Sequence, residues 1–119
     1  MAGVIHVKRI YEPKSAADGL RVLVDRLWPR GVTKATATVD VWMRDVAPSS
    51  NLRRWFGHKP DRWEEFQQRY RNELAGNLAL VELRRLAAMS NLTLLYAAKD
   101  QLHNHAVVLA DVLSGQPAD

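Results

Sequence analysis

The densest group of chemically capable residues is the run 25–31, Asp-Arg-Leu-Trp-Pro-Arg-Gly, which follows an apolar stretch. Its arginines carry planar forks of donors that match phosphate and carboxylate groups. Trp28 offers a flat surface for stacking, and Gly31 allows a ligand to approach the backbone closely. The run therefore suggests an anion clamp. An internal Arg–Asp pair that fixes the loop, with Trp28 filling the core, is the structural alternative.

A second group lies at residues 98–105, where a predicted strand leads into a predicted helix. The free amides at a helix N-terminus favour phosphate or carboxylate. Cysteine phosphatases and rhodaneses use the same strand–loop–helix arrangement, but their nucleophilic cysteine is absent here. The alternative is structural: Asp100 or Asn104 caps the helix, and Lys99 is a solvated side chain.

Ligands of open α/β sheets bind beyond the carboxyl ends of the strands. The two groups, together with Arg9 at the end of the first predicted strand, are therefore expected to share one edge. We predict that they bind a small anionic molecule, phosphorylated or carboxylate-bearing. The residues assigned to this site are Arg9, Asp25, Arg26, Trp28, Arg30, Lys99, Asp100 and His103.

Three of these residues are candidates for catalysis: Asp25, Asp100 and His103. An aspartate would act as acid or base, while the arginines stabilise developing negative charge. Whether the protein is an enzyme stays open, and the sequence names no reaction or cofactor. No metal is predicted, because His103 and His105 face different directions on a helix and no glutamate stands at ligand spacing behind them.

The charge is unevenly divided along the chain. Residues 1–60 carry eleven Lys/Arg against five Asp/Glu, and residues 61–119 carry six against eight. Twelve of the seventeen basic residues are arginine. The excess positive charge of the first half is consistent with an anionic partner, and a solvated basic face would explain it equally well.

Composition restricts the class of protein. The 119 residues suit one domain, 1–119, whose end at 114–119 we expect to be a frayed tail. The chain has no cysteine, hence no disulfide and no thiolate nucleophile. The first residues have the pattern of a strand and lack the basic and apolar segments of a signal peptide. No apolar run approaches the ~20 residues that cross a bilayer. We therefore expect a cytoplasmic protein with no membrane partner.

Periodicity predicts an α/β fold. Strand patterns occur at 4–11, 21–25 and 92–98, and 39–46 has the weakest one. Residues 92–98 are apolar almost throughout, as in an interior strand. The first strand is placed at an edge or antiparallel to the second, because the nine residues between them are too few for a helical crossover. We predict a small, mostly parallel or mixed sheet with helices on both faces, a three-layer sandwich.

The helices are predicted from apolar spacing and from caps. One spans 51–56, and a second starts at Pro60. A third contains Leu80, and the last follows the polar loop 99–103. The side chains expected to face the core are Trp63, Phe66, Tyr70, Leu74, Leu80, Leu83, Ala87, Val108, Leu109 and Val112.

Two other functions remain open. Helical arginines with interleaved tryptophans could bind nucleic acid, although Glu64, Glu65 and Glu73 dilute the basic face. The residues concerned are Arg53, Arg54, Arg62, Arg69, Arg71, Trp55 and Trp63. Alternatively, the clustered tryptophans could meet a protein partner. The oligomeric state is not predicted.

Long motifs cover almost the whole chain: VKRIY at 7–11, DGLRVLVDRLWPRG at 18–31, LRRWFGH at 52–58 and LLYAAKD at 94–100. In these motifs the chain resembles the short members of the bacterial family catalogued as domain of unknown function 488. The resemblance implies a cytosolic α/β domain of about this length with no assigned activity. Longer relatives carry Cys-His-Arg where this chain has Leu102-His103-Asn104, which removes any thiol role.

Overall fold

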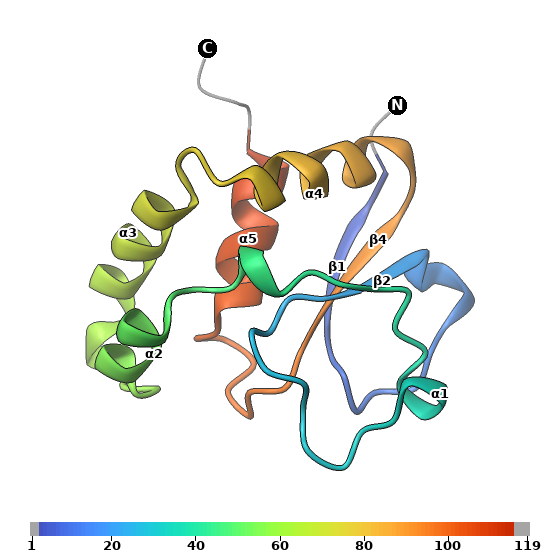
Figure 1. Cartoon of the computed structure of the whole chain (residues 1–119), viewed down its shortest axis with the longest axis horizontal. Helices are drawn as coiled ribbons and strands as arrows, with labels where there is room; N and C mark the ends of the chain where they lie inside the picture. The colour runs from blue at the N-terminus through green and yellow to red at the C-terminus, as the bar shows by residue number, and fades with distance from the viewer. Residues whose placement is uncertain (1–2, 116–119) are drawn as a thin grey trace.

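The structure, a computed structural model, describes residues 3–115 and is built on a four-stranded parallel sheet (Figure 1). The strands lie in the order β1 (Ile5–Arg9), β4 (Leu92–Tyr96), β2 (Leu20–Leu23) and β3 (Val41–Trp42). All three strand pairings are parallel. The α/β class predicted from the sequence is confirmed.

β4 lies between β1 and β2, and all five of its residues are buried. Leu92 pairs with Ile5 on one side and with Leu20 on the other. The predicted interior position of this strand and the predicted edge position of β1 are both confirmed. The antiparallel alternative for β1 is wrong, because β1 and β2 both run parallel to β4.

A helix is not needed to cross from β1 to β2. The connection contains only the 3-10 turn η1 (Ala16–Asp18). Its ten residues, 10–19, can extend over about 33 Å, which exceeds the roughly 17 Å length of a five-residue strand. An extended crossover is therefore long enough to bring the chain back for a parallel strand.

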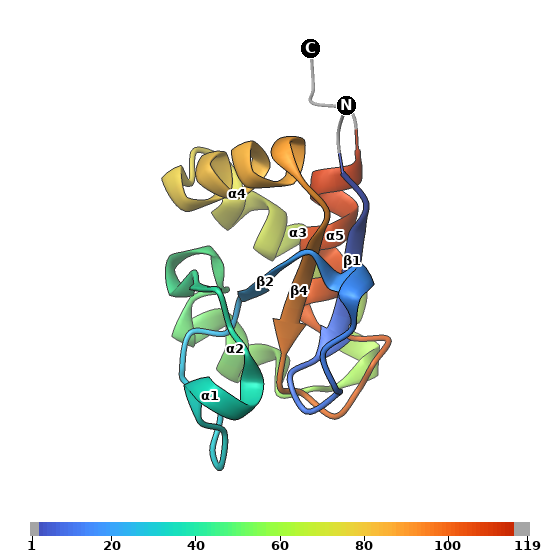
Figure 2. The same cartoon turned by 90° about the vertical axis from the view of Figure 1, so that its right-hand side faces the viewer.

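Four helices pack on one face of the sheet: α2 (Ser50–Phe56), α3 (Trp63–Leu74), α4 (Leu78–Met89) and α5 (His105–Ser114). Figure 2 shows α5 lying behind β1, with which it packs. The 3-10 turns η2 (Arg44–Val46) and η3 (Pro60–Arg62) precede α2 and α3. None of the described helices is long and apolar enough to span a membrane.

The helical face holds the main core. Alternate residues of the strands, such as Val22 and Leu94, meet the helices there. Phe66 and Tyr70 are buried as predicted, whereas Trp63 is half-buried. Burial is also confirmed for Leu74, Leu80, Leu83, Ala87, Val108 and Leu109, and Val112 is half-buried.

The opposite face is covered by one short helix, α1 (Lys34–Ala37), and by the loop before it. Leu23 and Leu95 form a small apolar cluster there with Ala37. The layer on this side is therefore thin, a single helical turn against four helices on the other face.

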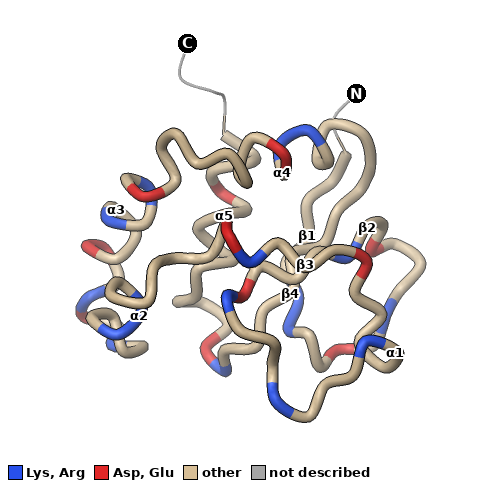
Figure 3. Tube along the Cα trace, in the orientation of Figure 1, with Lys and Arg blue, Asp and Glu red and all other residues tan. Residues whose placement is uncertain are grey.

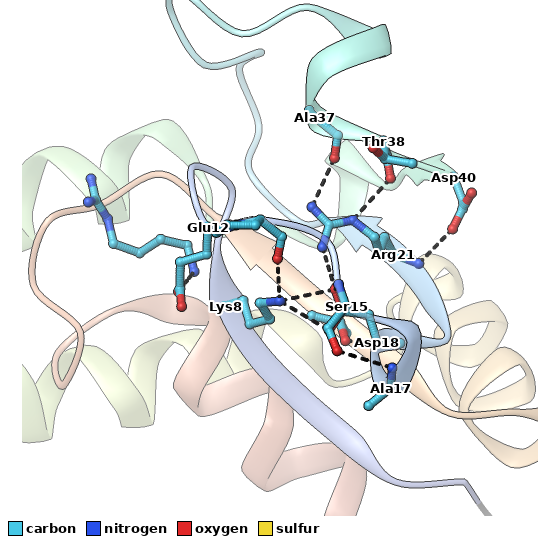
Figure 4. Close-up of polar contacts among 12 residues, drawn as sticks. Lys8, Glu12, Ser15, Ala17, Asp18, Arg21, Ala37, Thr38 and Asp40 are labelled. Carbon is cyan, nitrogen blue, oxygen red and sulfur yellow. Dashed lines mark hydrogen bonds and ion pairs between the residues drawn. The ribbon is translucent and has the colours of Figure 1, made fainter.

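A buried ionic network joins this thin layer to the sheet (Figure 4). Asp18 and Arg21 are 3% and 1% exposed, and Arg21 Nη1 donates to Asp18 at 2.5 Å. Lys8 Nζ donates to both carboxylate oxygens at 3.1 Å. Burial raises the pKa of Asp18, but hydrogen bonds from the Ser15 backbone, Lys8 and Arg21 outweigh it and lower the pKa from 3.8 to about 2.

Some predicted boundaries change. The predicted strand 39–46 contains only the two residues of β3, followed by η2, and β4 ends at Tyr96 because the Ala97 N–H donates to Asp25 Oδ2 (3.1 Å). Of the predicted tail, Ser114 is the last residue of α5 and Gly115 its C-cap. The rest of that tail lies outside the described residues.

Candidate functional site

A cleft of about 600 Å³ opens at the carboxyl ends of β2 and β4. Its walls come from the loop 25–30 after β2, from residues 47–58 around α2, from Ala97 and Ala98 after β4, and from the head of α5. Phe66 of α3 adds apolar surface. This is the edge where α/β sheets bind ligands.

Half of the predicted site lines this cleft. The residues that do so are Asp25, Arg26, Trp28 and Arg30, all from the loop after β2. The four that do not are Arg9, Lys99, Asp100 and His103. The first strand and the loop before α5 therefore contribute less to the cleft than their positions in the sequence suggested.

Arg26 and Arg30 have different environments although they share one loop. The half-buried Arg26 guanidinium donates to the carbonyls of Ala47 (3.1 Å) and Pro48 (3.2 Å), which ties the loop to the segment before α2. Arg30 is exposed and makes no hydrogen bond or ion pair within residues 3–115. Gly31 follows it in the left-handed region (φ 73°), and Arg30 lines the cleft.

α2 supplies two further arginines on the opposite wall. Arg53 and Arg54 are exposed and line the cleft. Arg54 donates to Asn51 Oδ1 at 2.6 Å, whereas the Arg53 guanidinium has no hydrogen bond or ion pair in the part of the chain that the structure describes. Figure 3 shows basic positions both on α2 and in the loop after β2. The sequence associated these two arginines with nucleic acid and not with this cleft.

The cleft contains one acidic residue among its described lining, Asp25. Its Oδ1 is buried without a hydrogen bond and lies 3.2 Å from His105 Nε2. The same nitrogen lies 3.0 Å from the Val24 carbonyl oxygen. Since both neighbours are acceptors, Nε2 of His105 carries a proton and donates to this end of β2.

Besides the two arginines of α2, the sequence prediction of the site missed His105. It was weighed only as a metal ligand, yet it is the first residue of α5 and its ring lines the cleft. Its position directly after the Asn104 cap, which accepts from Val107 N–H at 3.1 Å, was the available signal. Within residues 3–115 no group of three or more His, Asp or Glu side chains is arranged to hold a metal.

Asp100 and His103 form a local turn before α5. Asp100 Oδ1 accepts from the backbone N–H groups of Leu102 (2.9 Å) and His103 (3.0 Å), and Oδ2 lies 2.9 Å from His103 Nδ1. The Leu102 and His103 N–H groups hold the pKa of Asp100 below its usual range. The Trp63 ring meets the His103 ring edge-on at 5.3 Å.

Arg9 and Lys99 complete the predicted set. Arg9 donates to the carbonyls of Ala98 (2.9 Å) and Ala97 (3.2 Å), so it braces the end of β4 from the side. Lys99 is exposed and has no hydrogen bond among residues 3–115. Trp28 donates from its indole N–H to Val32 and packs against the thin layer, while also lining the cleft.

The helical arginines of the nucleic-acid hypothesis are mostly engaged within the chain. Arg62 and Arg69 lie over the Trp55 ring at 5.1 and 4.4 Å. Arg69 also pairs with Glu65, and Arg71 pairs with Asp111. Figure 3 shows both acidic and basic positions on α3.

The structure is a small α/β fold with a cleft at the carboxyl edge of a parallel sheet, lined by apolar side chains and by arginines. The chain belongs to the DUF488-N3i family, whose model, described as "Inactive DUF488-N3 subclade", matches residues 4–118. The predicted resemblance to the family of domain of unknown function 488 is thereby confirmed.

Relatives from distant bacteria align over almost the full length. The chain is 46% identical over 112 residues to Uncharacterized protein Rv3073c of Mycobacterium tuberculosis, covering 94% of this chain and 95% of the relative. It is 44% identical over 112 residues to Uncharacterized protein YeaO of Escherichia coli, covering 92% and 96%. No solved structure matches the chain.

Proposed function

We propose that the cleft binds a small anionic molecule through phosphate or carboxylate groups. The observation that carries the proposal is the pair Arg30 and Arg53. The two guanidinium groups come from different elements, have no partner within residues 3–115, and line one cleft whose described lining holds a single carboxylate. Unpaired arginines are suited to bidentate recognition of an anion.

The surroundings of the two arginines favour tight binding. Trp28, Phe56 and Phe66 contribute apolar surface, which lowers the local dielectric and strengthens ionic contacts. The head of α5 lies in the lining through Asn104 and His105, at the positive end of the helix. A volume of about 600 Å³ suits a ligand the size of a nucleotide or sugar phosphate.

We propose that the cleft binds its ligand and does not catalyse a reaction on it. The description of the matching subclade as inactive supports this, and the chain has no cysteine where strand–loop–helix phosphatases carry their nucleophile. Asp25 and His105 are the only acid–base pair in the described lining. Asp25 accepts the Ala97 N–H through Oδ2, its Oδ1 has no hydrogen bond, and His105 Nε2 lies 3.0 Å from the Val24 carbonyl oxygen. Their first role is to fix the end of β2.

Thermal unfolding with two probes, inorganic pyrophosphate and adenosine monophosphate, tests the proposal. Sodium chloride at matched ionic strength is the reference. A ligand at about 100 times its Kd adds about 2.7 kcal/mol, which raises Tm by roughly 10 °C for a domain of this size. We expect a saturable rise with at least one probe and none with chloride.

Three variants locate the effect. Arg30→Ala and Arg53→Ala should keep the Tm of the free protein and lose most of the ligand-induced rise. Lys14→Ala removes one exposed positive charge outside the cleft and should keep the rise. The proposal is wrong if neither probe saturates, or if Lys14→Ala loses as much as the cleft variants, since net charge alone would then explain the effect.

A further inference from the structure

The outer face of α4 carries three large exposed apolar side chains beside an exposed ion pair, Glu82–Arg85, whose arginine also contacts Met89 Sδ at 3.4 Å. Leu78, Val81 and Met89 are 83%, 62% and 69% exposed, although each is a large hydrophobic side chain. They share the solvent side of the helix with Glu82 and Arg85, because steps of three and four residues return to one face. Large exposed apolar side chains at both ends of one helix face, with a charged pair between them, make this face a candidate interaction surface.

The face has an internal symmetry. A two-fold rotation about an axis perpendicular to α4, through the midpoint between residues 83 and 84, reverses the helix direction. It exchanges the positions of Leu78 and Met89, and those of Glu82 and Arg85. Val81 would exchange with Leu86, which is half-buried and packs against the main core, so the symmetry of the exposed face rests on the other two pairs. Apolar residues therefore exchange with apolar residues and the acid exchanges with the base. A two-fold contact requires that each residue meets its reversed counterpart.

We propose that α4 packs antiparallel against α4 of a second copy of this chain, around a two-fold axis at that midpoint. Glu82 and Arg85 already form an ion pair within one chain. In the dimer the two pairs lie side by side with opposite charges facing, and Leu78 of each copy packs on Met89 of the other. A different protein partner would require no such reversal symmetry, which is why a second copy is the occupant chosen.

The surface extends past the end of the helix. Gly3 N–H donates to the Ala87 carbonyl at 3.1 Å, so the exposed Val4 (56%) lies beside the C-terminal turn of α4. The carboxyl-edge cleft has no residue of α4 in its lining, and the proposed dimer is therefore independent of anion binding. A single helix pair with these flanks is at the small end of stable interfaces, so we expect a dimer that dissociates on dilution.

Sedimentation equilibrium over a concentration series gives the first test. The full chain should approach dimer mass as concentration rises. Leu78→Glu should raise the dissociation constant roughly tenfold or more, since it places a carboxylate in the apolar contact. Leu102→Glu is the matched control, because Leu102 is also exposed (73%) but lies outside α4, and it should leave the dimer intact. A monomer at every concentration up to millimolar, or a dimer indifferent to Leu78→Glu, overturns the proposal.

Cysteine cross-linking tests the antiparallel register without background, because the chain has no cysteine. Residues 78 and 89 of one helix are about 16 Å apart, too far for an internal disulfide. The double variant Leu78→Cys/Met89→Cys should form covalent dimers on mild oxidation. Each single variant should not, since the identical positions of two antiparallel helices are equally far apart. Equal cross-linking of the single variants would overturn the proposed register.

Discussion

Replacing Arg21 by methionine tests the buried ionic network directly. Arg21 donates to the carbonyls of Ala37 (2.9 Å) and Thr38 (3.1 Å) of the thin layer as well as to Asp18. Methionine fills much of the same volume but has no donor. The variant therefore leaves two carbonyls and part of a carboxylate without partners inside the protein.

The magnitude follows from these losses. An unsatisfied buried acceptor costs about 1–3 kcal/mol, and breaking one side of a buried ion pair costs about 3–5 kcal/mol. Asp18 keeps Lys8 and the Ser15 N–H, which limits the penalty on the carboxylate. We expect Arg21→Met to lower the free energy of unfolding by about 3–5 kcal/mol.

Urea unfolding monitored by tryptophan fluorescence measures the change. The midpoint should fall with little change in the slope, because the surface exposed on unfolding is similar. Arg53→Met is the matched control, since Arg53 is exposed without a described partner, and it should change stability by no more than about 0.5 kcal/mol. A loss below about 1 kcal/mol for Arg21→Met would refute the view that the network secures the thin layer.

Four further outcomes are expected. The free energy of unfolding should fall by about 2 kcal/mol as pH drops from about 4 towards 2, because the pKa of Asp18 is lowered to about 2 in the folded state and its charged form stabilises the fold above the unfolded pKa. Acid titration of unfolding for wild type and Asp18→Asn measures this, and an equal fall in Asp18→Asn would contradict it. Phe66→Ala should cost about 3–5 kcal/mol in urea unfolding, as a buried aromatic does, and under about 1 kcal/mol would indicate a solvent-facing ring. Arg26→Ala should lower the free energy of unfolding by about 1–3 kcal/mol in the same assay, while Arg30→Ala should hardly change it. Equal losses would contradict the assignment of Arg26 to loop structure and of Arg30 to ligand binding. Hydrogen exchange should place the amides of β4 among the slowest, and fast exchange there would argue against an interior strand.

The interior strand could be predicted because its signal is local. Residues 92–96 are almost wholly apolar, and burial on both sides requires this of a central parallel strand. β3 could not be delimited from 39–46 in the same way. The strand stops at Trp42 and the chain turns into η2, where the Val46 carbonyl accepts from the Tyr70 hydroxyl at 2.5 Å, a contact between residues far apart in the chain.

In the candidate site too, local sequence signals could be predicted and contacts between distant residues could not. The loop after β2 was predicted as a site, and it lines the cleft. Its two arginines could not be distinguished, because the carbonyls that engage Arg26 belong to Ala47 and Pro48, some twenty residues away. Arg53 was overlooked for the same reason, since only the folding of α2 against this loop brings it to the cleft.

The most direct test of the anion cleft is a heteronuclear NMR titration of the full chain with inorganic pyrophosphate at constant ionic strength. We predict saturable shifts of the amides at 25–28, 30, 97–98 and 104–105 and of those around Arg53, with the rest of the protein unchanged. Arg30→Ala should weaken the whole set together, while Lys14→Ala should not. Shifts that grow without saturation, or that spread over the basic positions of α3 and α4, would contradict the proposal that this cleft is a specific anion site.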